Sequence, residues 1–125
     1  MGDLSKNFSA WEFRCPCGCG FDGVDPLLVQ SLQELRDIIK RPIRINSGCR
    51  CPRHNQDVGG EIDSQHLLGK AADVVVSGVD PGTIARIAER IPAFKQGGIG
   101  IYNTFTHLDV RDNGPARWDR RKEES

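Results

Sequence analysis

The first half of the chain contains one long amphipathic segment. Between positions 25 and 42, leucine and isoleucine recur at positions 28, 32, 35 and 39, which is the spacing of one helix face. Asp25 followed by Pro26 is a typical helix start, because aspartate caps free N–H groups and proline fits the first turn. Pro42 is expected to end the helix. The pattern predicts a helix that packs its apolar face on a core.

The same start signal returns later in the chain. Asp80-Pro81 precedes apolar residues at positions 84, 87, 88 and 91, which predicts a second amphipathic helix up to a stop at Pro92. A shorter helix is predicted over residues 52–58, where the Gly59-Gly60 pair ends it.

Alternating and β-branched runs predict the strands. Residues 43–46 alternate, residues 72–76 begin a run of valines, and residues 98–102 and 105–110 form a hairpin through Asn103-Thr104. Phe8, Trp11 and Phe13 form an aromatic arm that is too irregular for a regular element, and we expect it to pack on the core. The order of elements predicts an α+β fold with a small, mostly antiparallel sheet and helices packed on it.

The length of 125 residues predicts a single domain over residues 1–118, with a cysteine-rich arm over about residues 1–24 and a charged tail over residues 119–125. Acidic and basic residues balance at 17 each, which argues against nucleic acid or an anionic membrane as the main partner. Basic residues do gather near the end, but acidic residues alternate with them, so a solvated tail is expected for Arg117, Arg120, Arg121 and Lys122. We expect a monomer.

No stretch approaches the roughly 20 apolar residues of a spanning helix, so we expect no membrane insertion. Residues 1–10 also lack the apolar core and basic start of a signal peptide. The expectation is a protein that is cytoplasmic as synthesised.

Five cysteines fall in two clusters, Cys15-Pro16-Cys17-Gly18-Cys19 and Cys49-Arg50-Cys51. The odd number forbids complete pairing within the chain. Three interpretations stay open: a metal site where the clusters converge, a disulfide between them, or reduced and partly buried thiols.

Two histidines and one aspartate suggest a metal centre. His66 precedes Gly69, which permits a tight turn, and Asp73 opens the valine run, so both side chains can fold toward one point. His107 is the third candidate ligand. Two imidazoles and one carboxylate leave one position open on a tetrahedral zinc ion, as catalytic sites do, and this predicts a hydrolase. We interpret His54, in a polar stretch, as a surface histidine.

Asp109 follows His107 by two positions, so both side chains face the same side of a strand. Two roles stay open for Asp109. It is either the general base or an acceptor that fixes the orientation of a ligating imidazole.

Three motifs together carry a family resemblance. They are Ser47-Gly48-Cys49-Arg50, then Ser64-x-His66-x₆-Asp73, then His107-x-Asp109. This order resembles the zinc D-alanyl-D-alanine carboxypeptidase family, whose relatives include phage L-alanyl-D-glutamate endopeptidases and the hedgehog signalling domain. The resemblance implies a hedgehog-like fold, and it spans most of the chain.

The resemblance also implies roles for individual residues. His66, Asp73 and His107 would bind one catalytic zinc ion, and Arg50 would pair with a carboxylate or carbonyl of the substrate. Ser47, Ser64 and Gln65 would belong to the same substrate site. A guanidinium group suits this role, because its planar fork can hold a carboxylate with two hydrogen bonds.

One position departs from the family pattern. Many members carry a catalytic acid three residues before the last zinc histidine, where this chain has Thr104. A threonine cannot act as a carboxylate base. Three alternatives stay open: the base is Asp109, the base is an acid of the preceding loop such as Glu61 or Asp63, or catalysis is weak.

The resulting prediction is a zinc metallopeptidase that hydrolyses peptidoglycan stem peptides, as a D-alanyl-D-alanine carboxypeptidase or an L-alanyl-D-glutamate endopeptidase. It would reach the cell wall after release by lysis or as a phage component. A non-catalytic, zinc-containing binding domain of the hedgehog type is the alternative, and Thr104 favours it. In a third interpretation the cysteines form the principal metal site and the histidines are structural.

Overall fold

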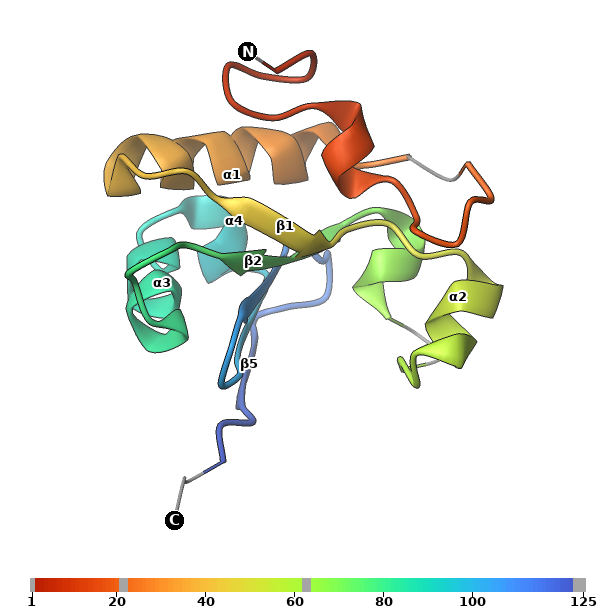
Figure 1. The fold of residues 1–125 in the computed structure, drawn as a ribbon. Coiled ribbons are helices and arrows are strands. Elements are labelled where there is room, and N and C mark those ends of the chain that lie inside the picture. Colours follow the sequence, from red (N-terminus) through yellow and green to blue (C-terminus); the bar gives the residue numbers. More distant parts are fainter. Residues whose placement is uncertain (1, 21–22, 62–63, 123–125) are drawn as a thin grey trace.

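The computed structural model describes residues 2–20, 23–61 and 64–122 and has a five-stranded sheet at its centre (Figure 1). The strand order is β1-β2-β4-β3-β5. Neighbouring strands are antiparallel except β3 and β5, which are parallel. The strands are β1 (Arg44–Ser47), β2 (Ala71–Val75), β3 (Gly98–Ile101), β4 (Thr106–Asp109) and β5 (Ala116–Asp119). The predicted α+β fold with a mostly antiparallel sheet is confirmed.

Four α-helices and two short 3₁₀ helices complete the described part of the chain. They are η1 (Ala10–Phe13), α1 (Pro26–Ile39), α2 (Pro52–Asp57), η2 (Gln65–Leu68), α3 (Pro81–Ala88) and α4 (Pro92–Lys95). The carboxylate of Asp25 accepts a hydrogen bond from the Leu27 N–H at 2.8 Å and so caps α1. Asp80 caps α3 in the same way through the Thr83 N–H. Both predicted starts are confirmed.

The two faces of the sheet serve different purposes. Helices α3 and α4 pack on β3 and β4, and α1 packs against α4 (Figure 1). Side chains of alternate strand residues, such as Val74 and Leu108, join this core, together with Phe8 and Phe13 of the N-terminal arm. The residues between them point to the opposite face. Asp73, His107 and Asp109 of the central strands therefore lie on that face.

Two expectations about helices need correction. Pro92 was expected only to end a helix, but α3 already ends at Ala88 and Pro92 begins α4. The arm forms a 3₁₀ turn at η1, although its aromatic residues predicted no regular element. Proline at the first helical position explains the first error, because the same residue that stops one helix favours the start of the next.

The expected tail does not include Arg117, although this residue is exposed as expected. This residue lies in β5, where its Nε donates to Glu89 Oε1 at 2.6 Å and its Nη1 donates to the Gly97 carbonyl oxygen at 2.9 Å. Residues 123–125 of the predicted tail lie outside the described residues.

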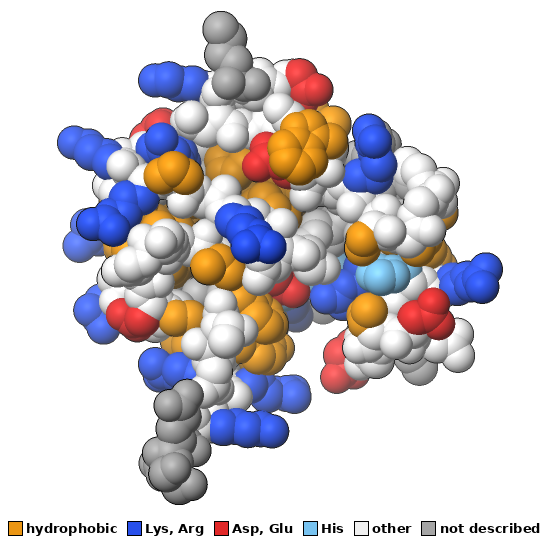
Figure 2. All heavy atoms as spheres, in the orientation of Figure 1, with side chains coloured by type: hydrophobic (Ala, Val, Ile, Leu, Met, Phe, Trp, Pro, Cys, Tyr) orange, Lys and Arg blue, Asp and Glu red, His pale blue; other side chains and the backbone are white. Residues whose placement is uncertain are grey.

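Among the residues that the structure describes, no helix combines the length and apolar character needed to cross a membrane. Figure 2 shows Lys and Arg side chains spread over one face, with acidic side chains between them. On the described part of this face, neither sign of charge forms one dominant patch. This distribution agrees with the balanced composition of 17 acidic and 17 basic residues.

Candidate active site

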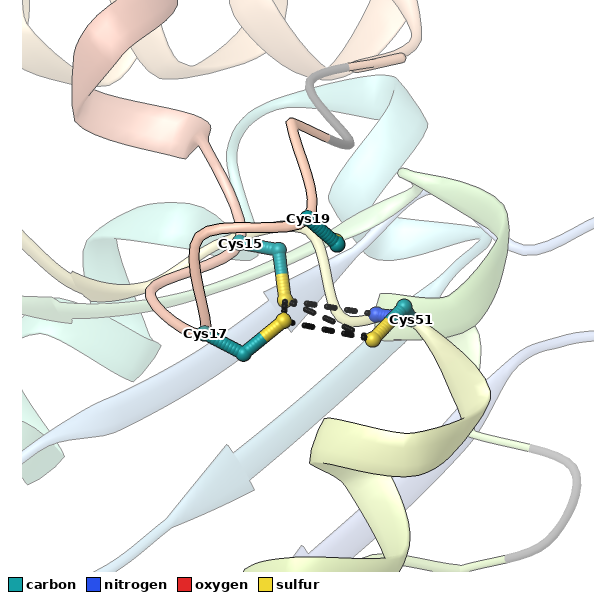
Figure 3. Close-up of side chains that lie close together, drawn as sticks. All are labelled: Cys15, Cys17, Cys19 and Cys51. Carbon is teal, nitrogen blue, oxygen red and sulfur yellow. Dashed lines mark hydrogen bonds between the residues drawn. The ribbon is translucent and has the colours of Figure 1, made fainter.

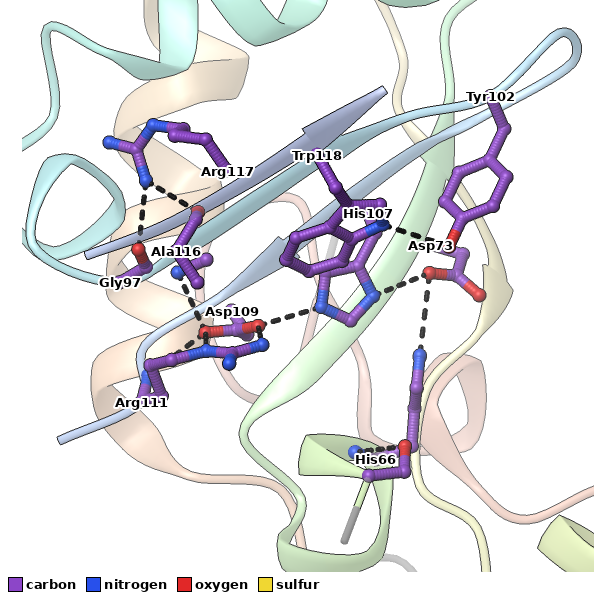
Figure 4. Close-up of polar contacts among 12 residues, drawn as sticks. His66, Asp73, Gly97, Tyr102, His107, Asp109, Arg111, Ala116, Arg117 and Trp118 are labelled. Carbon is purple, nitrogen blue, oxygen red and sulfur yellow. Dashed lines mark hydrogen bonds and ion pairs between the residues drawn. The ribbon is translucent and has the colours of Figure 1, made fainter. Parts of the chain in front are cut away.

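The register of the two central strands brings Asp73 and His107 together. Asp73 of β2 lies directly opposite His107 of β4, and both side chains are on the face away from the helices. His107 Nδ1 lies 3.1 Å from Asp73 Oδ1 (Figure 4). Both residues are buried. Strand pairing therefore fixes the distance between the two groups.

His66 reaches the same point from a tight turn. Ser64 caps η2 by accepting a hydrogen bond from the His66 N–H, and Gly69 ends η2 in the left-handed conformation with a φ of 69°. A residue with a side chain would be strained there. The turn places His66 Nε2 3.3 Å from Asp73 Oδ1. The side-chain donor atoms of His66, Asp73 and His107 all lie within 4.8 Å of one another.

Hydrogen bonds behind the rings decide which ring nitrogens face this point. His66 Nδ1 lies 2.6 Å from the Gly48 carbonyl oxygen, which can only accept, so Nδ1 carries the proton. His107 Nε2 lies 2.7 Å from Asp109 Oδ2, and donates to it. A ring that binds a metal ion must be neutral, and with the proton on the far nitrogen, His66 Nε2 and His107 Nδ1 would present lone pairs beside Asp73 Oδ1. Three acceptor atoms converge, which is the electrostatic arrangement of a cation site, and the donor set suits zinc.

The ionisation of the central groups follows from the same contacts. Burial alone would raise the pKa of Asp73, but hydrogen bonds and positive charge from His107 and His66 hold this pKa well below its usual range. Burial would lower the pKa of His107, but hydrogen bonds to Asp109 and Asp73 raise it. The site therefore keeps an ionised carboxylate between two imidazole rings.

Asp109 lies behind His107 and is completely buried. Its Oδ1 accepts hydrogen bonds from the Gly98 N–H at 2.8 Å and from Arg111 Nε at 2.9 Å. Its Oδ2 accepts from Arg111 Nη2 at 2.7 Å as well as from His107. Burial alone would raise the pKa of Asp109, but the bonds from His107 and Arg111 lower it well below its usual range. A Cβ atom on Gly98 would collide with this carboxylate, so glycine is required in β3 at that position.

An open cleft with a volume of about 510 Å³ lies over the three converging residues. In Figure 2 the surface is hollowed between the lobe that carries α2 and the rest of the molecule. Besides the three ligand candidates, the lining side chains include Arg50, Glu61, Ser64, Gln65, Tyr102, Phe105, Arg111, Asn113, Trp118 and Arg120. Among the described lining residues, only Asp73 and Glu61 carry carboxylates. Basic side chains outnumber acidic ones, which favours a ligand with negative charge.

Arg50 is held at the edge of this cleft by three side chains. Its Nη2 lies 3.4 Å from Asp73 Oδ2, its Nε donates to Ser47 Oγ at 3.2 Å, and its Nη1 donates to Asn55 Oδ1 at 3.2 Å. The guanidinium group therefore has a fixed position beside the ligand candidates.

Aromatic side chains form one wall of the cleft. The Trp118 ring lies 4.9 Å from the His107 ring, and its Nε1 donates to the Tyr102 hydroxyl at 2.9 Å. The indole ring covers Gly100 of β3 so closely that a Cβ atom there would overlap it. The Arg111 guanidinium lies 5.5 Å from the Trp118 ring centre, a cation–π contact. The wall thus connects Arg111, His107 and Tyr102 through one tryptophan.

The family model described as Peptidase M15 matches residues 6–109. The chain belongs to the peptidase M15 family. The match includes His66, Asp73 and His107, and M15 peptidases are zinc-dependent, which agrees with the donor set found here. No curated protein matches the chain.

The predicted site residues occupy different places in this M15 peptidase. Arg50, Ser64 and Gln65 line the cleft beside His66, Asp73 and His107, whereas Ser47 supports Arg50 from behind. Asp109 is not among the residues that line the cleft. Thr104 is exposed in the connection between β3 and β4, and Asp63 lies outside the described residues. The roles assigned to these residues from the sequence stay predictions.

Sequence reasoning did not assign functions to Arg111, Tyr102 and Trp118. Arg111 continues the alternation of His107 and Asp109, so the i, i+2 spacing was a usable signal for a third residue in the same network. The alternation of Gly98 and Gly100 was a second signal, because glycine inside a strand often marks the close approach of another group.

Proposed function

We propose that this protein is a zinc metallopeptidase that hydrolyses peptide bonds in the stem peptides of peptidoglycan. The observation that carries this proposal is the convergence of two ring nitrogens and one carboxylate oxygen below an open cleft. Structural zinc sites are normally closed by four protein ligands, whereas catalytic sites leave a position accessible. When bound, zinc supplies polarisation of the scissile carbonyl and activation of a water molecule at neutral pH.

Arg50 is proposed to bind a carboxylate of the substrate. Its guanidinium lies at the cleft edge, 3.4 Å from Asp73, and Ser47 and Asn55 hold its orientation. Arg111 and Arg120 add two more positive charges to the lining. Stem peptides carry free carboxylates and D-residues, so a cleft of this charge suits them better than it suits neutral peptides.

Glu61 is proposed as the general base. It is the one carboxylate besides Asp73 among the described lining residues, and Asn55 Nδ2 donates to its carbonyl oxygen at 2.7 Å, which holds its backbone at the cleft. In the proposed reaction, the water oxygen bonds to the scissile carbonyl carbon and Glu61 takes the water proton. Glu61 then returns the proton to the leaving nitrogen as the carbon–nitrogen bond breaks.

Asp109 is proposed to orient His107 rather than to act as the base. Its carboxylate is completely buried, and it already accepts hydrogen bonds from His107, Arg111 and Gly98. A base must reach the reacting proton directly or through one water. The environment of Asp109 supports the other role that the sequence left open, which is to fix the tautomer and direction of a ligating imidazole.

The test is incubation of the zinc-loaded protein with purified peptidoglycan and with synthetic stem peptides, followed by mass analysis of the products. Release of D-alanine, or a new N-terminus at D-glutamate, is the expected result and identifies the bond. Glu61→Gln should lower kcat by about 10²-fold or more with zinc content unchanged. Glu34→Gln is the matched control, because Glu34 is an exposed residue of α1 far from the cleft.

A fully metallated protein that cleaves neither substrate would overturn the peptidase proposal. That result would support the non-catalytic binding domain of the hedgehog type. If cleavage occurs and Glu61→Gln retains full activity, the peptidase proposal stands and the assignment of the base is wrong.

A further inference from the structure

A second group of metal-ligating side chains lies apart from the cleft. Cys15, Cys17 and Cys19 of the N-terminal arm meet Cys51, which immediately precedes α2 (Figure 3). One sulfur atom from each residue lies within 4.8 Å of the others. Two segments that are distant in the sequence therefore present four sulfur atoms to one small volume.

The distances between the sulfur atoms are those of a metal site rather than of a disulfide. Cys15 Sγ and Cys17 Sγ are 3.5 Å apart, Cys17 Sγ and Cys51 Sγ are 3.5 Å apart, and Cys15 Sγ and Cys51 Sγ are 3.9 Å apart. A disulfide bond is about 2 Å long. Four sulfurs at about 2.3 Å from a tetrahedral zinc ion lie about 3.8 Å from one another, which is close to the observed spacing.

The backbone around the cysteines is shaped to present the sulfur atoms. Gly18 and Gly20 both have a φ of 87°, a left-handed conformation that lets the chain turn on either side of Cys19. Added Cβ atoms at these glycines would meet nothing, so the conformation and not the available space requires glycine. The Cys51 N–H donates to Cys15 Sγ and the His54 N–H donates to Cys51 Sγ, each at 3.4 Å. Hydrogen bonds of this kind stabilise negative charge on sulfur.

We propose that Cys15, Cys17, Cys19 and Cys51 form a second, structural zinc site. Four thiolates complete a tetrahedral coordination shell and leave no open position, so this site would hold structure and take no part in hydrolysis. The fifth cysteine, Cys49, is buried in the hydrophobic core and does not belong to the group. This assignment accounts for the odd number of cysteines without an intermolecular disulfide.

The position of the site indicates what it stabilises. The ion would fasten residues 15–19 of the arm to the start of α2, next to Arg50 in the sequence. Arg50 lines the cleft, so the cysteine site would hold the backbone that carries this arginine. Arm residues Phe8 and Phe13 are already fixed in the core, which leaves the segment after Phe13 as the part that needs a link.

The first test is the zinc content of the purified, reduced protein. We expect two zinc ions per chain, and one ion per chain in Cys17→Ser and in Cys19→Ser, whose wild-type side chains are exposed. Cys49→Ala should keep two ions and serves as the matched cysteine control. Asp73→Ala should keep the cysteine-bound ion, and the combination of Cys17→Ser with Asp73→Ala should bind none.

The second test begins with the wild-type protein, so its first outcome does not depend on whether a variant folds. Wild-type protein loaded with Co²⁺ should show strong thiolate-to-cobalt charge-transfer absorption, and this band should persist in Asp73→Ala and disappear in Cys17→Ser. The proposal is overturned if the wild-type protein binds one ion that Asp73→Ala removes and Cys17→Ser retains. A protein mass showing a disulfide within the group would overturn it as well. Because the two sites are lost through different substitutions, failure here is distinguishable from failure of the peptidase proposal.

Discussion

The two groups of metal-ligating side chains in this molecule are built in opposite ways. Asp73 and His107 lie on paired central strands, and all three residues of the histidine-aspartate group are buried. Three of the four cysteines come from an irregular arm, and Cys17 and Cys19 are exposed. The pairing of β2 and β4 holds Asp73 and His107 in position, and the η2 turn holds His66. The second group has no strand pairing to hold it, so the ion itself must supply the link.

The contrast concerns what the free energy of metal binding does at each site. In a preorganised site, little of the free energy of metal binding goes into ordering the protein, so the bound metal is already placed for chemistry. A site formed by an irregular segment converts metal affinity into folding free energy. The following experiments test whether the two sites differ in this way.

The largest expected effect is the loss of activity in Asp73→Ala. We expect kcat/KM to fall by at least about 10³-fold, because several kcal/mol of transition-state stabilisation depend on the metal. The cysteine group should keep its ion, since its ligands lie on other segments. Peptide hydrolysis and zinc content are the measurements, and Asp57→Ala at the exposed end of α2 is the control. Activity within tenfold of wild type would show that Asp73 is not a ligand in the working enzyme.

Removal of all metal by a chelator should affect the two regions unequally. We expect backbone amides of residues 14–20 to exchange at least about 100-fold faster, because the arm loses its link to α2. Amides of β2 and β4 should change little, because the register of these strands does not depend on an ion. Hydrogen exchange followed by mass spectrometry separates the segments. Equal loss of protection in β2 and the arm would contradict the contrast between the sites.

Asp109→Asn should weaken the histidine-aspartate site from behind. We expect zinc affinity and kcat to fall by about 10–100-fold, as is typical for a carboxylate that orients a ligating histidine. KM should change less, because Asp109 does not line the cleft. Zinc competition and steady-state kinetics are the measurements. Asp112→Asn is the matched control, since that side chain is 89% exposed. A pure loss of activity at unchanged zinc affinity would favour a direct catalytic role for Asp109 instead.

Trp118→Phe is expected to have the smallest effect. The substitution removes the hydrogen bond from Trp118 Nε1 to the Tyr102 hydroxyl and reduces the ring area over His107. The loss in free energy of unfolding should be about 0.5–1.5 kcal/mol, and kcat/KM should fall by a few fold. Thermal unfolding and kinetics measure the two effects. Trp11→Phe, at a ring that is 70% exposed, should change neither.

Much of the fold followed from local signals. Asp25-Pro26 and Asp80-Pro81 mark helix starts through capping and a fixed φ, and neither depends on distant residues. Strand β5 was missed because its signal is weak and its pairing is distant. Its positions alternate between partly buried and exposed. It pairs in parallel with β3, and β4 lies between these two strands in the sequence. Such pairing is decided by tertiary contacts that a local pattern does not contain.

The candidate site was predictable to a similar extent. The turn at Gly69 and the valine run predicted that His66 and Asp73 approach one point, and the structure brings their donor atoms and those of His107 within 4.8 Å of one another. The sequence could not choose between the roles of Asp109, because that choice depends on Arg111 and Gly98 closing around the carboxylate. It also could not decide among the interpretations of the cysteines. Cys19 approaches Cys51 because the chain turns at Gly18 and Gly20. The sequence allows these turns but does not fix their direction.

The strand register described for Asp73 and His107 also sets the order in which the site is assembled during protein synthesis. Asp73 precedes its partner on β4 by 34 residues, and Trp118 on β5 follows later still. At roughly 5–20 residues per second, the ribosome needs several seconds to add the second half of the site. A nascent chain that contains His66 and Asp73 but ends before β4 therefore lacks the third ligand candidate, His107, and the Trp118 ring beside it. The order of strands therefore delays completion of the site until β4 and β5 have been synthesised.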